Sequence, residues 1–242
     1  MELFEAVTTT RAIRRYRPDP VPEADLARML FAATRAPSGS NRQPFRFLVL
    51  RDGPCARQAR ALLGEAFRAM WGDKRSDDRY DQGTGADRSS PKARMAAAMQ
   101  HFVDHVDQAP VIVLACVASW RDRHVTEGAS VYPACQNLLL AARDLGYGGV
   151  MTVWHRLVED RLAEILALPE RAGIAATIPL GRPAGHHGPV RRHPLADLVF
   201  EDRWDQPAGW AVDPPGTRFA SGPPRTTDRR VAGPPAPDAG RA

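Results

Sequence analysis

The sequence predicts a protein of the α/β or α+β class in which helices cover a small sheet. The chain of 242 residues is long enough to bury a sizeable core. Its hydrophobic content of 43% and charged content of 25% are typical of a globular protein. Segments with the apolar spacing of helices alternate along the chain with short β-branched runs that suit strands.

Apolar periodicity predicts the elements in chain order. Residues 22–35 place Leu26, Met29 and Ala33 on one helical face, with Pro22 in the first turn. Further helices are predicted at 54–71, 91–107, 130–145 and 158–168, a strand and turn at 45–53, and strands at 109–119, 150–154 and 172–183. Gly146 stands in the C-cap position of the helix at 130–145.

Two polar regions interrupt this pattern. Residues 72–90 are too polar for a core and predict a mobile surface segment or lid. From about residue 203 the chain becomes rich in proline and poor in apolar residues. We therefore expect one domain at 1–202 and a Pro-rich C-terminal extension at 203–242, with a disordered end.

Charge and composition exclude several classes of partner. The formal charge is +5, but acidic residues are interspersed with the arginines and no basic stripe is present, so no nucleic-acid partner is expected. No apolar run suits a membrane span and no signal peptide is evident. Cys55, Cys116 and Cys135 are far apart and form no CxxC pair, which predicts a reducing, cytoplasmic location.

Arginines gather in the stretch TTRAIRRYRPDPVP at residues 9–22. Arg11, Arg14, Arg15 and Arg17 stand close together between two helices, and arginine suits bidentate binding of a phosphate. The alternative is a basic connector that pairs with nearby acids. The residues of this stretch leave both interpretations open.

The stretch APSGSNRQPF follows one helix later, at residues 36–45. Its small residues would let backbone approach a flat ligand, and its Ser, Asn and Gln side chains would supply polar contacts to a ring edge. The alternative is a turn capped by Ser and Asn side chains. Because only one helix separates the two stretches, a shared binding site is possible.

Together these segments resemble the nitroreductase family of FMN-dependent oxidoreductases. The resemblance covers roughly residues 3–200 and rests on four segments in the family's order: the RxxR opening at 11–14, APSGxNxQP at 36–44, QNLLLAARDLGYGG at 136–149, and IPLGRP with VRRHPL at 178–195. It implies an α+β, nitroreductase-like fold: a central, mostly antiparallel sheet covered by helices. It also implies an intertwined homodimer with FMN at the subunit interface.

The resemblance also implies roles for individual residues. Arg11 would bind the FMN phosphate, and Arg14 would lie near the ribityl chain or the pyrimidine edge of the ring. The loop at 37–39 would come from the partner chain and border the ring, with Asn41 bracing it. The implied cofactor-binding residues are Arg11, Ala12, Arg14, Pro37, Ser38, Gly39, Asn41, Met151, Thr152 and Arg192.

Three positions depart from the family pattern. Thr10 stands where many members have another arginine, Ala12 where serine is common, and Phe45 where tryptophan is frequent. The phosphate site would therefore have fewer ligands, unless Arg191 and Arg192 compensate.

Other motifs predict no site. His186 and His187 lack a third metal ligand and indicate an exposed turn, and His101 with His105 lacks an HExxH context and indicates a polar helix face. GYGGVM follows a helix and lacks GxGxxG, so it does not predict a Rossmann loop.

The expected activity is a two-step redox cycle with NAD(P)H as donor and a small-molecule acceptor such as a nitroaromatic, a quinone or another flavin. No catalytic side chain and no metal are expected. Two alternatives stay open: a relative that uses oxygen or fragments its flavin, and a non-catalytic flavin-binding protein.

Overall fold

The computed structural model describes residues 1–118 and 125–220. The chain divides into two compact units, Met1–Gly188 and Pro189–Ala242. The first unit holds the sheet and the α-helices of the described residues. The domain boundary expected at residue 202 stays a prediction, and the expected disordered end at 221–242 lies outside the described residues.

Helices and strands alternate in the first unit, and its sheet is antiparallel throughout. The helices are α1 (Leu3–Thr9), α2 (Glu23–Ala33), α3 (Pro54–Asp77), α4 (Pro91–His105), α5 (Gly128–Asp144) and α6 (Glu159–Ile165); the strands are β1 (Phe45–Leu50), β2 (Val111–Ala118), β3 (Gly148–Gly149) and β4 (Ala172–Gly181). The strand order is β1-β2-β4-β3. This architecture confirms the predicted α+β class and its antiparallel sheet covered by helices.

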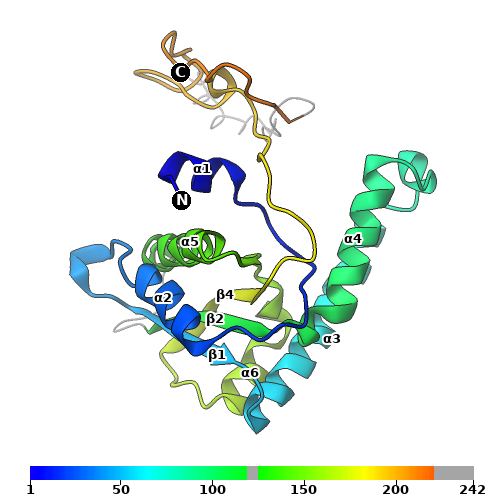
Figure 1. Cartoon of the computed structure of the whole chain (residues 1–242), viewed down its shortest axis with the longest axis vertical. Coiled ribbons are helices and arrows are strands. Elements are labelled where there is room, and N and C mark those ends of the chain that lie inside the picture. The colour runs from blue at the N-terminus through cyan, green and yellow to red at the C-terminus, as the bar shows by residue number, and fades with distance from the viewer. Residues whose placement is uncertain (119–124, 221–242) are drawn as a thin grey trace, which may run out of the picture. The chain divides into compact units, whose positions relative to one another are not determined.

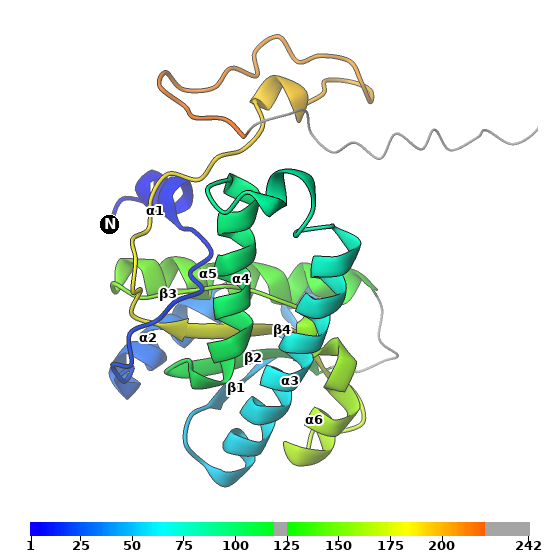
Figure 2. The same ribbon diagram turned by 90° about the vertical axis from the view of Figure 1, so that its right-hand side faces the viewer.

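Helices cover both faces of the sheet (Figures 1 and 2). Val111, Val113 and Ala115 of β2 join one core cluster together with residues of α2 and α5. Ile112 and Leu114 alternate with them and join a second cluster with residues of α3, α4 and α6. Because successive side chains of a strand point to opposite faces, an uninterrupted apolar strand such as β2 must be buried on both sides.

Local sequence explains where α4 begins and where α5 ends. The Ser90 hydroxyl accepts a hydrogen bond from the Ala93 N–H at 3.0 Å, and Pro91 occupies the first turn of α4, where its missing N–H costs nothing. Gly146 follows α5 with φ of +80°, which glycine adopts without strain. The predicted C-cap is therefore confirmed.

The first part of the polar segment predicted at 72–90 is helical. α3 continues past residue 71 to Asp77, and a 3-10 turn follows at Gly83–Ala86. The helix extends because its polar end is solvated and paired: Lys74 contacts Asp78 at 2.6 Å one turn away, and Arg75 contacts Asp81 at 2.8 Å. That the remainder acts as a mobile lid stays a prediction.

The prediction of a strand at 150–154 is wrong. β3 ends at Gly149, Thr152 forms only an isolated bridge to Thr177, and a 3-10 turn occupies Trp154–Val158. The chain leaves the extended conformation because the buried His155 ring bonds to β4, through Nε2 to the Ile174 carbonyl at 2.9 Å and through Nδ1 to the Thr177 hydroxyl at 3.1 Å.

Two other predictions concern cysteines and membranes. Cys116 and Cys135 are buried and Cys55 is exposed; all three are free thiols, in line with the absence of a CxxC pair. Within the described residues, each helix is too short or too polar to reach across a bilayer.

The second unit has little regular structure in its described part. It contains a 3-10 turn at Leu195–Asp197 and an isolated bridge between Arg192 and Phe219. The Leu195 N–H donates to the Asp213 carboxylate at 2.9 Å. Turn hydrogen bonds within the backbone, such as that from the Ala211 N–H to the Ala208 carbonyl at 3.0 Å, hold most of this part together.

Two glycine substitutions are expected to change stability in opposite directions. A Cβ on Gly149 would lie 2.7 Å from the Pro179 carbonyl oxygen and 3.1 Å from Leu139, so Gly149→Ala forces backbone apart and lowers the free energy of unfolding by about 1–3 kcal/mol. A Cβ on Gly72, inside α3, meets nothing within 4 Å, so Gly72→Ala raises the free energy of unfolding by about 0.5–1 kcal/mol. Urea unfolding at one protein concentration measures both, and equal effects would contradict this account.

Candidate functional site

The arginine-rich stretch at 11–17 lies along the edge of the sheet where β3 pairs with β4. The Ile13 N–H donates to the Gly149 carbonyl at 2.9 Å, and the Arg17 N–H donates to the Arg182 carbonyl at 2.8 Å. These are backbone bonds, so they fix the path of the stretch without using its side chains. The arginine side chains are left to contact other groups.

Tyr16 and Gly148 hold the same stretch close to the sheet. The Tyr16 hydroxyl lies 2.6 Å from the Ile13 carbonyl oxygen and 3.0 Å from that of Pro179, and it donates to this pair of acceptors. A Cβ on Gly148 would lie 2.5 Å from Cγ1 of Ile13. Gly148 therefore lets the Ile13 side chain pack directly against the backbone of β3.

A cavity of about 530 Å³ opens beside the stretch. Arg11, Ala12 and Arg14 line it from one side, and Met95 and Ala98 of α4 from the other. Its volume lies in the range of small-molecule sites, about 300–1,000 Å³. None of the described residues that line it is acidic. The cavity thus combines apolar wall with positive charge and suits an anionic, partly flat ligand.

The Arg14 side chain is half-buried, unlike that of Arg11. Burial lowers the pKa of the Arg14 guanidinium, which still stays protonated at neutral pH. A cation that has lost part of its hydration interacts more strongly with a nearby negative charge. Arg14 can therefore stabilise negative charge on a ligand in this cavity.

His187 bridges the backbone of Arg11, at the start of the arginine-rich stretch, and that of Tyr147, which follows α5. Its Nε2 lies 3.0 Å from the Tyr147 carbonyl oxygen, and its Nδ1 lies 3.4 Å from the Arg11 N–H. This geometry requires the neutral ring, with Nε2 donating and Nδ1 accepting. Burial lowers the pKa of His187, and the neighbouring Arg143 and Arg11 lower it further, which favours that form.

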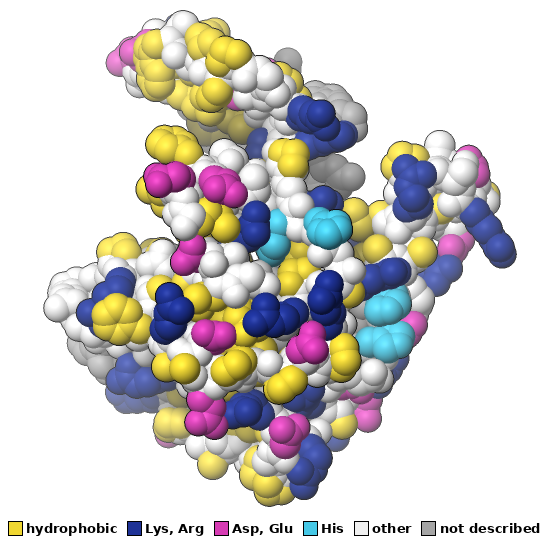
Figure 3. Space-filling view, viewed as in Figure 1, with side chains coloured by type: hydrophobic (Ala, Val, Ile, Leu, Met, Phe, Trp, Pro, Cys, Tyr) yellow, Lys and Arg dark blue, Asp and Glu magenta, His cyan; other side chains and the backbone are white. Residues whose placement is uncertain are grey.

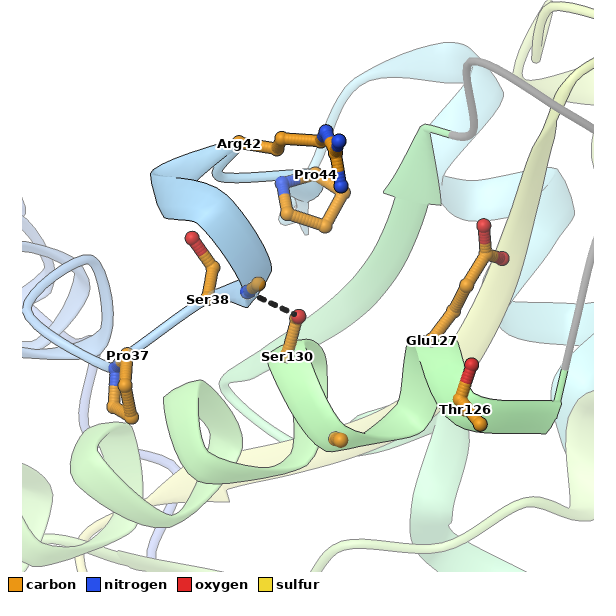
Figure 4. A pocket seen from close by; sticks show the side chains of 9 residues that line it. Pro37, Ser38, Arg42, Pro44, Thr126, Glu127 and Ser130 are labelled. Atoms are coloured by element: carbon orange, nitrogen blue, oxygen red, sulfur yellow. Dashed lines mark hydrogen bonds between the residues drawn. The ribbon is translucent and has the colours of Figure 1, made fainter.

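The loop predicted from APSGSNRQPF lines a different cavity, of about 360 Å³. Pro37, Ser38 and Gly39 form one wall, and the first turn of α5 forms another. Figure 4 shows Ser130 of α5 pointing towards the loop, where its hydroxyl oxygen lies 3.4 Å from the Gly39 N–H. Ser38 in turn accepts from the Gln43 N–H at 3.0 Å.

Three residues of this loop hold a left-handed backbone although they are not glycine. Ser40, Asn41 and Gln43 have φ of 52°, 51° and 49°. Each such residue costs of order 1–3 kcal/mol, and such strain concentrates at binding sites. The Asn41 side-chain oxygen accepts from the Gln43 amide at 3.1 Å. This contact is the kind of brace that the resemblance implies for Asn41, whose role stays a prediction.

The sequence-predicted site residues thus fall into separate groups. Arg11, Ala12 and Arg14 line one cavity, and Pro37, Ser38 and Gly39 line another; no described residue lines both. Met151 is 43% exposed, and Thr152 exchanges backbone hydrogen bonds with Thr177 at 3.0 and 2.8 Å. Arg192 is exposed and belongs to the second unit.

Sequence reasoning missed His187, Tyr16 and Ser130. The prediction of an exposed turn at 186–187 holds for His186, but His187 is half-buried and bonded. No signal in the sequence indicates which of two adjacent histidines is exposed and which is half-buried. The contact of Ser130 with Gly39 depends on tertiary structure, and no local pattern around Ser130 indicates it.

Comparison with known proteins adds to this geometry. The model of the nitroreductase family matches residues 7–182. The chain belongs to the nitroreductase family. A Thermus thermophilus protein named NADH dehydrogenase is 31% identical over 208 residues, 81% of this chain and 93% of that protein. Iodotyrosine deiodinase 1 of Rattus norvegicus is 25% identical over 190 residues, 76% of this chain and 62% of that protein.

A solved structure is also similar to this nitroreductase family member. It comes from Desulfovibrio desulfuricans, is assigned as a nitroreductase in complex with FMN, and is 28% identical with a TM-score of 0.61. The match covers 84% of this chain and 98% of that one. The family and fold expected from the sequence are therefore confirmed, and an FMN-dependent oxidoreductase with NAD(P)H as donor is supported.

Tyr16→Phe tests how the arginine-rich stretch is held. The variant removes the hydroxyl that bonds to the Ile13 and Pro179 carbonyls in a partly buried place, so the free energy of unfolding should fall by about 1–2 kcal/mol. The matched control is Tyr132→Phe, whose exposed hydroxyl lies 3.5 Å from its acceptor and should matter by less than about 0.5 kcal/mol. Urea unfolding compares the two; a larger effect of the control would refute the assignment.

Proposed function

We propose that this protein is an FMN-dependent oxidoreductase that takes electrons from NAD(P)H and passes them to electron-poor small molecules such as nitroaromatics or quinones. The observation that carries the proposal is the cavity lined by Arg11 and Arg14 in a chain of the nitroreductase family. The FMN in the Desulfovibrio desulfuricans relative supports the choice of cofactor. A cytoplasmic location is part of the same proposal.

The residues of the cavity fit FMN. A guanidinium binds phosphate with two parallel hydrogen bonds, and the exposed Arg11 is free of ion pairs within the described residues. The half-buried Arg14 would lie by the ring's pyrimidine edge and favour negative charge there. Bound FMN would supply the hydride and electron chemistry, and the protein would position it.

The separation of the two cavities supports a homodimer. Pro37, Ser38 and Gly39 line a cavity to which Arg11 and Arg14 do not contribute. We propose that this loop borders the flavin bound by a second, intertwined copy of the chain. Met151 and Thr152, just beyond β3, would lie along the ring, and Arg192 would be a second phosphate contact.

The acceptor would bind against the exposed face of the flavin. Since no acid, base or nucleophile is required of the side chains, the shape of the site would set the choice of acceptor. The similarity to iodotyrosine deiodinase 1 favours a second class of acceptor, the halogenated phenols. Oxygen use with breakdown of the flavin, and flavin binding without catalysis, are the remaining alternatives.

The visible spectrum of the purified protein tests the cofactor and the donor. We expect the absorbance of oxidised flavin, which should bleach under anaerobic conditions when NADH or NADPH is added and return when a quinone or nitroaromatic follows. Slow or absent bleaching of a yellow protein would point to a non-catalytic flavin-binding protein. Loss of flavin absorbance with oxygen and no added acceptor would favour the flavin-fragmenting class.

Arg11→Gln tests the phosphate contact. Losing one charged, bidentate partner should weaken FMN binding by at least about tenfold, and riboflavin, which has no phosphate, should bind the variant and the parent equally. Fluorescence titration of the apoprotein measures both affinities. Arg161→Gln, on the exposed side of α6, is the matched control and should bind FMN as the parent does. An unchanged FMN affinity in Arg11→Gln would remove Arg11 from the site.

A further inference from the structure

A third cavity, smaller than the two described above, lies between residues 14–18 and the C-terminal half of α4. Its volume is about 230 Å³, below the usual range for whole small-molecule ligands, about 300–1,000 Å³. The cavity of about 530 Å³ that Arg11 lines contacts the N-terminal half of α4 instead. The smaller one therefore suits a single chemical group.

The lining of this cavity is strongly basic. Arg14, Arg15 and Arg17 contribute to it from one side, and His101 and His105 of α4 from the other. Within residues 1–118 and 125–220, none of these three arginines forms an ion pair, and no acidic side chain lines the cavity. Several unneutralised guanidinium groups around one space are the usual setting for an anion with several oxygens.

The two histidines add a buried, unsatisfied polar atom. Their rings stack with centroids 4.3 Å apart and planes 20° apart. His105 Nδ1 donates to the His101 carbonyl oxygen at 2.8 Å, which fixes the orientation of its ring. His101 Nδ1 is buried and has no hydrogen-bond partner among the described residues.

We propose that this cavity, which shares Arg14 and Arg15 with the one proposed for FMN, binds a phosphate group of its own. Arg15 and Arg17 would neutralise its charge, and the His101 ring, which also lines the cavity, would lie beside it. The group can be free phosphate, or it can belong to a larger molecule such as the nucleotide donor. The second source rests on the proposed function, whereas the first does not.

Phosphate binding should be coupled to protonation of His101. The charged and titratable groups around this ring are Arg14, Arg15, Arg17, Asp104 and His105. Burial lowers the pKa of His101, and Arg15 and His105 lower it further while Asp104 raises it, so the ring is neutral at pH 7 in the free protein. A bound anion raises this pKa, so binding takes up a proton and strengthens as the pH falls from neutral towards the lowered pKa.

Calorimetric titration of the FMN-saturated protein with inorganic phosphate tests the site. Sulfate is the second probe, because its own charge stays constant in this pH range, so a change in its affinity reports the protein. We expect binding of both ions, and with sulfate we expect proton uptake by the protein, seen as a dependence of the binding heat on the buffer's heat of ionisation. Arg17→Gln should weaken binding about tenfold, and His101→Gln should abolish the proton uptake. Arg161→Gln, on exposed α6, should behave as the parent.

Steady-state kinetics distinguish the two sources of the phosphate. If the group belongs to the donor, Arg17→Gln should raise KM for NADPH and leave KM for NADH unchanged, because only NADPH carries the extra phosphate. If free phosphate is the ligand, both KM values stay unchanged while phosphate binding weakens. Absence of binding to the parent protein, or equal binding by Arg17→Gln and Arg161→Gln, overturns the proposal. An inactive protein that still binds phosphate would contradict only the proposed function.

Discussion

The hydrogen bond from the Ile13 N–H to the Gly149 carbonyl is the contact on which both candidate sites depend. It joins a stretch near the N-terminus to β3, which follows α5, and it needs Gly148 because any side chain there would collide with Ile13. Together with the bond from the Arg17 N–H to the Arg182 carbonyl, it fixes the backbone path of the stretch from Arg11 to Arg17 at two points. The arginines can therefore serve two cavities at different places along α4, with Arg14 and Arg15 contributing to both.

Much of the fold could be predicted from local sequence because buried side chains recur at a regular spacing along helices and strands. The helical stripe at Leu26, Met29 and Ala33 predicts one buried helix face, and the unbroken apolar run of β2 predicts a strand that is buried on both faces. The end of α5 at Gly146 was equally local, since only the backbone conformation decides it. The polar end of α3 and the two-residue β3 could not be predicted in this way. The first is held by ion pairs and the second by its partner strand, and neither leaves a periodic pattern.

The candidate site was predictable to the extent that it consists of contiguous stretches. Arg11 and Arg14 are three residues apart, and residues 37–39 are consecutive, so their groupings can be read from the sequence. The contacts of His187 with Arg11 and of Ser130 with Gly39 join residues 176 and 91 positions apart. Such pairs depend on how the sheet and helices are folded, and no single stretch carries a signal for them.

The left-handed residues of the loop at 40–43 bear on how this protein could be redesigned. Ser40, Asn41 and Gln43 adopt a conformation that glycine would adopt at lower energy. A stabilised variant chosen by backbone preference alone would therefore place glycine at these positions. It would also remove the hydrogen bond between the Asn41 and Gln43 side chains and the polar surface that they present. In this loop, backbone preference and side-chain hydrogen bonding make opposite demands on the same residues.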